Sequence, residues 1–216
     1  MAVTAEQHAA AQRTVSSLCS ALERVIKGRN DTIRLVVAAL VADGHVLLED
    51  YPGSGKTTLS KTLGRLISED TPSNSRFPSL ASDPILPFRR IQFTPDMLPG
   101  DVLGVNIFDP KSGQFHFMHG PVFTHIVLAD EINRASPKTQ SALLEAMQEG
   151  HVTSGGVTHP LPRPFLVLAT RNPIDQEGTY PLPEGQLDRF MFLLRLDYPD
   201  GDDELEIVRR TTGPGL

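Results

Sequence analysis

The sequence predicts an α/β fold in which a parallel β-sheet is flanked by helices. Short apolar runs such as "HIVLAD" (125–130) and "FLVLAT" (165–170) do not alternate with polar residues, which is typical of strands buried on both faces. Segments with the apolar spacing of helices separate these runs, and such alternation favours a parallel sheet. A glycine-rich turn, "PGSGKTT" (52–58), links another short apolar run, at 46–48, to a helix.

Two helices are expected before the first strand. Residues 4–27 form the first, because Thr4 and Gln7 match a capping box and apolar residues recur on one face. The second runs from about 31 to 42, and 46–48 then form a short buried strand. The residues expected to point inward are Val15, Leu18, Leu22, Val25 and Ile26 in the first helix and Ile33, Val36, Val37, Leu40 and Val41 in the second.

The rest of the chain alternates strands and helices and adds two small hairpins. The glycine-rich turn leads into a helix over 56–68, and residues 69–87, rich in proline and serine, predict a long surface loop. A further helix is expected to start at Ser136 and to stop at Gly150. The remaining strands are expected at 89–93, 125–130, 165–170 and 190–196, and the hairpins at 108–117 and 151–161.

Composition limits the classes of protein to which the chain can belong. Its 216 residues suffice for one sizeable domain, and 39% hydrophobic with 21% charged residues are typical of a globular protein. The net charge of −6 and the lack of a strongly basic run argue mildly against a nucleic-acid surface. Cys19 is the single cysteine, which excludes an internal disulfide. Without a signal pattern or a long apolar run, a cytoplasmic location is expected.

The turn after the first strand is similar to a phosphate-binding loop, whose usual pattern is G-x-x-x-x-G-K-[ST]. Backbone N–H groups and the helix N-terminus would face the phosphates, Lys56 would reach the β and γ phosphates, and the Thr57 hydroxyl would bind Mg²⁺. Asp50 stands where the pattern has its first glycine. Because aspartate tolerates left-handed backbone angles, a nucleotide pocket is still expected. The alternative is a chance strand–turn–helix with a solvated lysine. The predicted contact residues are Asp50, Tyr51, Pro52, Gly53, Ser54, Gly55, Lys56, Thr57 and Thr58.

Polar side chains also follow two other predicted strands. Asp130 and Glu131 come at the end of one apolar run, and Asn172 follows another. Because the carboxyl ends of parallel strands meet at one edge of a sheet, these residues are expected near the same ligand. Asp130 would orient Mg²⁺, Glu131 would polarise an attacking water, and Asn172 would hydrogen-bond the γ-phosphate or that water. The alternatives are a polar strand end and a simple turn before proline.

Together these segments resemble the AAA+ ATPases, and most closely their MoxR group. Of the four matching strings listed below, the one that starts at His119 and the one that starts at Leu168 are specific to the group, whereas the phosphate loop alone is not. The resemblance implies the P-loop NTPase fold, ATP and Mg²⁺ as cofactors, and a hexameric ring with ATP between subunits. The strings cover most of residues 22–210 and are "HVLLEDYPGSGKTTL", "RIQFTPDMLPGDVLG", "HGPVFTHIVLADEINRASPKTQSALLEAMQEGHVT" and "LATRNPIDQEGTYPLPEGQLDRFMFLLRLDYP".

The resemblance assigns roles to the candidate residues already described. Lys56 and Thr57 look like the Walker A pair, Asp130 and Glu131 like Walker B, and Asn172 like sensor 1. These roles agree with the chemistry expected of the same side chains at the edge of a parallel sheet.

Two arginines are candidates for contacts between subunits. Arg189, in "LDRF", resembles the arginine finger that reaches a neighbour's γ-phosphate; the alternative is an ion pair with Asp188 or Glu184 of the same subunit. Arg134 is a second candidate, and its alternative is a surface salt bridge. The segment "VIKGRNDTI" resembles the adenine side of the pocket, with Val25, Ile26 and Gly28 as candidate contacts.

In domain terms, the resemblance implies one large nucleotide-binding subdomain over residues 1–210. The helical lid that carries the sensor 2 arginine is expected after position 210 and is expected to be absent, with 211–216 as a truncated tail. The smaller parts are an N-terminal helix (1–27), the long loop (69–87), a hairpin like the helix-2 insert (105–123) and one like the pre-sensor hairpin (151–161).

The function that the resemblance implies is an ATP-driven ring that remodels or activates client proteins, acting with a partner that has a von Willebrand factor A domain. Two alternatives belong to other classes: a nucleotide-dependent scaffold that does not hydrolyse ATP, and an ATPase that acts on DNA. The paired acids Asp130 and Glu131 argue against the first alternative. The acidic net charge argues mildly against the second.

Overall fold

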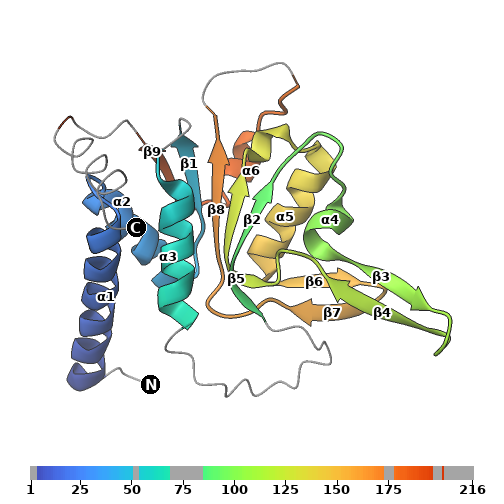
Figure 1. Cartoon of the computed structure of the whole chain (residues 1–216), viewed down its shortest axis with the longest axis horizontal. Helices are drawn as coiled ribbons and strands as arrows, with labels where there is room; N and C mark the ends of the chain where they lie inside the picture. The colour runs from blue at the N-terminus through green and yellow to red at the C-terminus, as the bar shows by residue number, and fades with distance from the viewer. Residues whose placement is uncertain (1–3, 51–53, 69–84, 173–177, 197–200, 202–216) are drawn as a thin grey trace, which may run out of the picture.

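The structure, a computed structural model, describes residues 4–50, 54–68, 85–172, 178–196 and 201. A five-stranded sheet lies at its centre in the order β2-β5-β8-β1-β9, and every neighbouring pair is parallel. All carboxyl ends of the strands therefore lie at one edge, toward which the arrows point in Figure 1. The predicted parallel sheet is confirmed. Its strands are β1 (Val46–Asp50), β2 (Leu86–Gln92), β5 (Thr124–Asp130), β8 (Leu166–Arg171) and β9 (Phe192–Leu196).

Helices cover both faces of this sheet (Figure 1). Neighbouring residues of one strand pack into opposite cores: Leu47 faces the core that contains α5, and Leu48 faces the core beneath α1 to α3. This two-sided burial explains why the strands are continuously apolar in sequence. The helices are α1 (Ala5–Val25), α2 (Asn30–Val41) and α3 (Lys56–Ser68) on one side, α4 (Pro99–Leu103), the 3-10 turn η1 (Ile132–Arg134) and α5 (Pro137–Glu149) on the other, and the short α6 (Glu184–Leu187).

The helix ends follow the signals in the sequence. The N–H of Gln7 donates to Thr4 Oγ1 at 3.2 Å, and the N–H of Thr4 donates to Gln7 Oε1 at 2.9 Å, which completes the expected capping box. Gly150, in the left-handed conformation, ends α5. Two inward predictions are wrong: Val25 is 49% exposed and Val41 is 66% exposed. Each is the last residue of its helix, where a side chain on the apolar stripe has passed the end of the surface it packs against.

Two antiparallel hairpins project from the α5 side of the sheet. They consist of β3 (Gly104–Asp109) with β4 (Gln114–His119), and of β6 (His151–Ser154) with β7 (Val157–Pro160). Figure 1 shows that β3 and β4 reach furthest from the sheet. The hairpins touch through Asn106 Nδ2, which donates to Ser154 Oγ at 3.0 Å, and through the ring of Phe117 stacked on His159.

Some boundaries differ from expectation. Strand β2 begins at Leu86 rather than at position 89, because its start pairs in register with Thr124 of β5. The rest of the expected long loop, 69–84, and the expected tail, 211–216, lie outside the described residues. No helix in the described ranges is long and apolar enough to cross a membrane.

Candidate functional site

The structure brings Lys56 and Asp130 together at the carboxyl edge of the sheet. Lys56 is the first residue of α3, directly after the turn that follows β1, and Asp130 is the last residue of β5. Lys56 Nζ lies 3.0 Å from Asp130 Oδ1, and the side chains are 17% and 3% exposed. A lysine from the loop and an acid from a strand two positions away in the sheet thus form a nearly buried ion pair.

Asp130 receives two further donors. Thr170 Oγ1, on the neighbouring strand β8, donates to Oδ1 at 2.7 Å, and Arg90 Nε, on β2, donates to Oδ2 at 3.0 Å. Burial by itself would raise the pKa of Asp130. The hydrogen bonds from Thr170, Lys56 and Arg90 outweigh burial and hold the pKa below its ordinary value. Asp130 is therefore a charged carboxylate at neutral pH.

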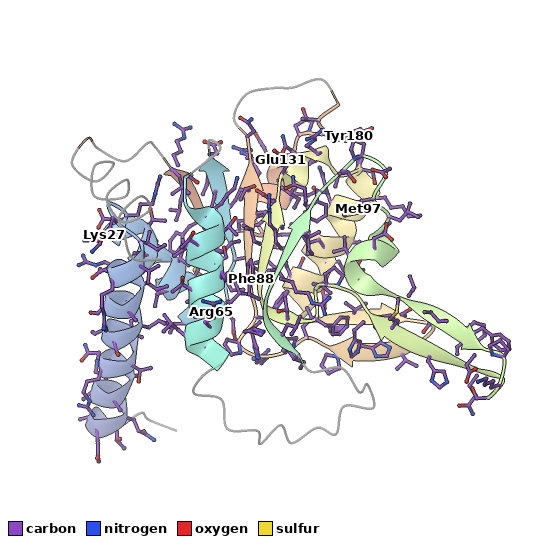
Figure 2. All side chains as sticks on the ribbon, in the orientation of Figure 1. Lys27, Arg65, Phe88, Met97, Glu131 and Tyr180 are labelled. Carbon is purple, nitrogen blue, oxygen red and sulfur yellow. The ribbon has the colours of Figure 1, made fainter. Side chains whose placement is uncertain are left out.

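Glu131 stands in an unusual backbone conformation at the same edge (Figure 2). Its φ of 57° and ψ of 51° are left-handed, which is uncommon for a residue other than glycine and is often found at functional sites. Its N–H donates to Thr170 Oγ1 at 2.9 Å. Its Oε2 accepts from Gln92 Nε2 and from Arg134 Nη1, each at 3.0 Å. For Arg134, the structure thus shows a surface salt bridge, and its partner is Glu131.

The described part of the loop has features that suit an anionic ligand. Gly55 has a φ of +86°, and among the described residues beyond its two chain neighbours no atom lies within 4 Å of the position that a Cβ would take. The Oγ of Ser54 is buried and has no hydrogen-bond partner among the described residues. Thr57 and Thr58, in the first turn of α3, are exposed. The Ser54 hydroxyl, the exposed Thr57 and the N-terminus of a 13-residue helix fit a phosphate group and its Mg²⁺ ion.

Several predicted loop contacts lie outside the described residues: Tyr51, Pro52, Gly53 and the side chain of Asp50. The backbone of Asp50 is the last residue of β1 and pairs in register with Leu196 of β9. The consensus glycine position is therefore still part of the strand here.

An ion-pair row holds three strand ends together beneath the loop. Glu49 pairs in register with Arg171 of β8 and Arg195 of β9. Its Oε1 accepts from Arg171 Nε at 3.0 Å, and its Oε2 accepts from Arg195 Nε at 2.8 Å. Burial tends to raise the pKa of Glu49, but the two arginines hold it below the ordinary value. Asn172, the half-buried residue after Arg171, is thereby fixed one strand away from the phosphate loop.

The candidate adenine contacts lie on the α3 side of the sheet. Ile26 is buried in the same core as Leu196, the register partner of Asp50. Gly28 has a left-handed φ of 69°, and Val25 is exposed. The segment is therefore placed on the α3 side of the sheet, and its contact with a base stays a prediction.

Arg189 lies at the opposite edge of the sheet. The N–H of Met191 donates to the His45 carbonyl at 2.8 Å, and Phe192 pairs with Val46, the first residue of β1. Five strand residues, roughly 16 Å at about 3.3 Å per residue, separate this edge from the loop. Arg189 is exposed and lines a surface hollow of about 630 Å³ together with Asp43, Gly44 and Gln148, among others.

The alternative assignment for Arg189 was an ion pair within the subunit. Among the residues that the structure places, no salt bridge joins Arg189 to Asp188 or to Glu184. Because Arg189 lies near the opposite edge of the sheet, it does not meet the Lys56–Asp130 pair of its own subunit.

Comparison with known proteins shows what this arrangement belongs to. Residues 45–192 match the family described as "ATPase family associated with various cellular activities (AAA)". The chain belongs to this family of AAA+ ATPases. The chain is 52% identical over 187 residues to the protein YeaC of Bacillus subtilis and 43% identical over 206 residues to Chaperone MoxR1 of Mycobacterium tuberculosis. The predicted membership of the MoxR group is confirmed.

A solved structure supports the same AAA+ fold. A crystal structure of a protein from Cytophaga hutchinsonii, 41% identical, superposes with a TM-score of 0.76 over 97% of this chain and 60% of that one. YeaC is matched over 87% of this chain and 53% of its own length, and MoxR1 over 95% and 50%. The chain therefore spans about half the length of these two relatives. The AAA+ family and the structural neighbour make it a P-loop NTPase.

Four residues of this AAA+ site were not assigned a role from the sequence. They are Glu49, Arg90, Gln92 and Thr170, and each acts on a partner in another strand or, for Gln92, on the residue directly after one. Arginine and glutamine inside the strand "RRIQF" were a visible signal, because a strand within an α/β sheet has few polar side chains unless they are paired. Glu49 gave no such signal, since it adjoins a loop that is polar in any case.

Proposed function

We propose that this chain binds ATP with Mg²⁺ at the carboxyl edge of its sheet and hydrolyses it, as the motor of an assembly that remodels or activates other proteins. The observation that carries the proposal is the 3.0 Å pair between Lys56 Nζ and Asp130 Oδ1. It brings the phosphate loop against the strand end that carries both acids, while Thr170 on the next strand holds the two acids in place.

Each side chain has a role that follows from its chemistry. Lys56 would turn its ammonium from Asp130 to the β and γ phosphates, and Thr57 with Asp130 would hold Mg²⁺. The metal, when bound, would neutralise charge on the phosphate oxygens. Glu131 would accept a proton from the attacking water, and Asn172 would hydrogen-bond the γ-phosphate or that water.

We further propose that Arg189 completes the site of a neighbouring subunit in a hexameric ring. It is exposed and lies at the edge of the sheet away from its own phosphate loop, so its own γ-phosphate is out of reach. A planar guanidinium suits a phosphate whose charge shifts during transfer. Client proteins belong to the same proposal, and the name of the relative Chaperone MoxR1 supports them. A partner with a von Willebrand factor A domain belongs to it through the family resemblance alone. Apolar side chains exposed on the β3–β4 hairpin, such as Phe115 and Met118, are candidates for client contacts.

Glu131→Gln tests the hydrolytic role. We expect this variant to bind ATP as tightly as the parent protein, while phosphate release falls by at least about 100-fold, because a positioned general base contributes about 10²–10⁴-fold. Equilibrium binding of a fluorescent ATP and a phosphate-release assay measure the two quantities. Glu145→Gln, on an exposed position of α5, is the matched control and should leave both unchanged. Normal phosphate release by Glu131→Gln would remove the base assignment.

A second candidate function, a scaffold that binds nucleotide without hydrolysing it, is favoured by one observation. The same oxygen of Glu131 accepts hydrogen bonds from Gln92 and Arg134, so it is engaged rather than free to hold a water. Nucleotide binding and assembly by the parent protein without any phosphate release would support the scaffold.

Stimulation of phosphate release by DNA would instead support a DNA-acting ATPase.

A further inference from the structure

Arg90 occupies the side of Asp130 that the phosphate-loop lysine leaves open. It lies on the edge strand β2, two residues before Gln92, the register partner of Asp130. Its side chain therefore runs along the strand toward the carboxyl edge. Its Nε donates to Asp130 Oδ2 at 3.0 Å, and its Nη2 donates to the same oxygen. Nη2 also donates to Gln92 Oε1 at 2.6 Å.

Both carboxylate oxygens of Asp130 are consequently engaged by the protein itself. Oδ1 lies beside Lys56 Nζ and accepts from Thr170 Oγ1, and Oδ2 receives two N–H groups from Arg90. Two cations thus surround one anion at an almost fully buried position. A Mg²⁺ ion, or a water in its shell, needs a lone pair of the same carboxylate. A Mg²⁺ ion bound to this carboxylate would also repel the Arg90 guanidinium, because both are positively charged and close together.

The two cations of Asp130 differ in what ATP offers them. Lys56 would gain the phosphates as a new partner when nucleotide binds. Arg90 is 48% exposed, so its guanidinium can move into water at modest cost, whereas Asp130 is 3% exposed and stays in place. The arginine is therefore the group that gives way at Oδ2.

We propose that Arg90 is a built-in counterion of Asp130 that competes with Mg²⁺ for this carboxylate. The proposal rests on the proposed function of the site as a Mg²⁺-dependent ATP site. Arg90 stabilises the charged carboxylate while no metal is bound and raises the Mg²⁺ concentration that the site requires. It is a positioning residue for the metal ligand and makes no contact with the reacting atoms.

The test compares ATP binding with and without the metal. The dissociation constant of a fluorescent ATP is measured in EDTA and in saturating Mg²⁺, and the quantity of interest is the ratio of the first to the second. In Arg90→Gln, Lys56 is the remaining cation beside Asp130 among the described contacts, and it would leave this carboxylate for the phosphates when ATP binds. ATP binding is therefore expected to weaken in EDTA and to strengthen in Mg²⁺, which takes the place of the lost cation. We expect the ratio to rise about three- to tenfold, the range set by losing one partly exposed charged hydrogen-bonded pair. Arg90→Lys keeps the charge but cannot make both N–H contacts, so its ratio should lie between those of the parent protein and Arg90→Gln.

The matched control is Arg163→Gln. Arg163 also pairs with an aspartate, Asp43, at 3.4 Å, but this pair is at the surface, near the start of β1. Its ratio should equal that of the parent protein. Thermal unfolding of every variant separates loss of structure from loss of binding.

Two results would overturn the proposal. If Arg90→Gln weakens binding equally in EDTA and in Mg²⁺, then Arg90 holds a phosphate rather than competing with the metal. If the ratio stays at the parental value while only the unfolding temperature falls, the contact is structural. Failure of the proposed function is distinguishable, because the parent protein would then bind the fluorescent ATP in neither condition.

Discussion

Thr170 Oγ1 donates to Asp130 Oδ1 at 2.7 Å and accepts the N–H of Glu131 at 2.9 Å. One hydroxyl on β8 thus fixes both acids at the end of β5. The hydroxyl donates its one O–H hydrogen to Asp130 and accepts from Glu131, and it does so at a buried position. The geometry of the acid pair consequently depends on a residue that has no role of its own in phosphate chemistry.

Replacing Thr170 by valine should therefore destabilise the protein. The variant keeps the shape of the side chain but leaves the N–H of half-buried Glu131 without its acceptor and buried Asp130 without one donor. We expect a loss of about 1–3 kcal/mol in the free energy of unfolding, measured by urea denaturation. Thr170→Ser, which restores the hydroxyl, should recover most of it. Thr158→Val, on an exposed position of β7, is the control and should change stability little.

The position of Arg189 gives a test of the ring that needs no structure of the assembly. Arg189→Ala and Glu131→Gln should each lose phosphate release on its own while retaining ATP binding. If Arg189 acts on a neighbour, then mixing the two variants creates some interfaces with an intact Glu131 on one side and an intact Arg189 on the other. We expect the mixture to regain a measurable fraction of the activity. An arginine that acts within its own subunit predicts no recovery, because no mixed site would be complete.

His45 predicts a dependence of stability on pH. It is buried at the start of β1, accepts the N–H of Val167 at Nδ1, and donates from Nε2 to the Met147 carbonyl, each at 3.1 Å. Burial holds its pKa below the ordinary value of 6.5, so the folded protein favours the neutral ring. The unfolded chain takes up a proton as the pH falls through 6.5. The stabilisation is therefore complete above this pH and is lost progressively below it.

This dependence can be measured by urea denaturation at several pH values. We expect the free energy of unfolding to fall between about pH 7.5 and about pH 5.5, and the slope to be reduced in His45→Gln. His8→Gln, on an exposed position of α1, should retain the parental slope. If the parent protein, His45→Gln and His8→Gln all had the same slope, His45 would not be the cause of the loss of stability at low pH.

The close contact between α3 and β2 at Gly64 predicts the effect of adding one methyl group there. A Cβ on Gly64 would lie 2.7 Å from the carbonyl oxygen of Pro87 and 2.9 Å from the Cβ of Phe88, a residue labelled in Figure 2. Gly64→Ala should lower the free energy of unfolding by about 1–3 kcal/mol, because overpacking outweighs the gain of about 1 kcal/mol in helix propensity. Lys61→Ala, on an exposed position of the same helix, should be close to neutral. A Gly64→Ala variant as stable as the parent would mean that α3 can shift away from β2.

Local signals in the sequence were sufficient for the four long helices, for the strands of the sheet and for the edge at which the site lies. The capping box of Thr4 and Gln7 and the left-handed Gly150 fix helix ends through contacts only a few residues away. Continuous apolar runs indicate buried strands whatever their neighbours are. Because parallel strands all end at one edge, the lysine, the two acids and the asparagine could be placed near one another before their strand order was known.

What only the tertiary structure decided is which side chain meets which. Arg90, Gln92, Thr170 and Glu49 act on residues in, or directly after, other strands. Their partners follow from the order β2-β5-β8-β1-β9 and from the register, which no local pattern encodes. The exposure of Val25 and Val41 was decided in the same way, by where a helix ends relative to the surface it covers. The sequence by itself determined the four long helices, the strands of the sheet and the kinds of group at its carboxyl edge, but not the short helices α4 and α6. The long-range pairing of strands determined that Asp130 meets two cations and that Arg189 lies near the opposite edge of the sheet, because hydrogen bonds and ion pairs depend on distances that only packing sets.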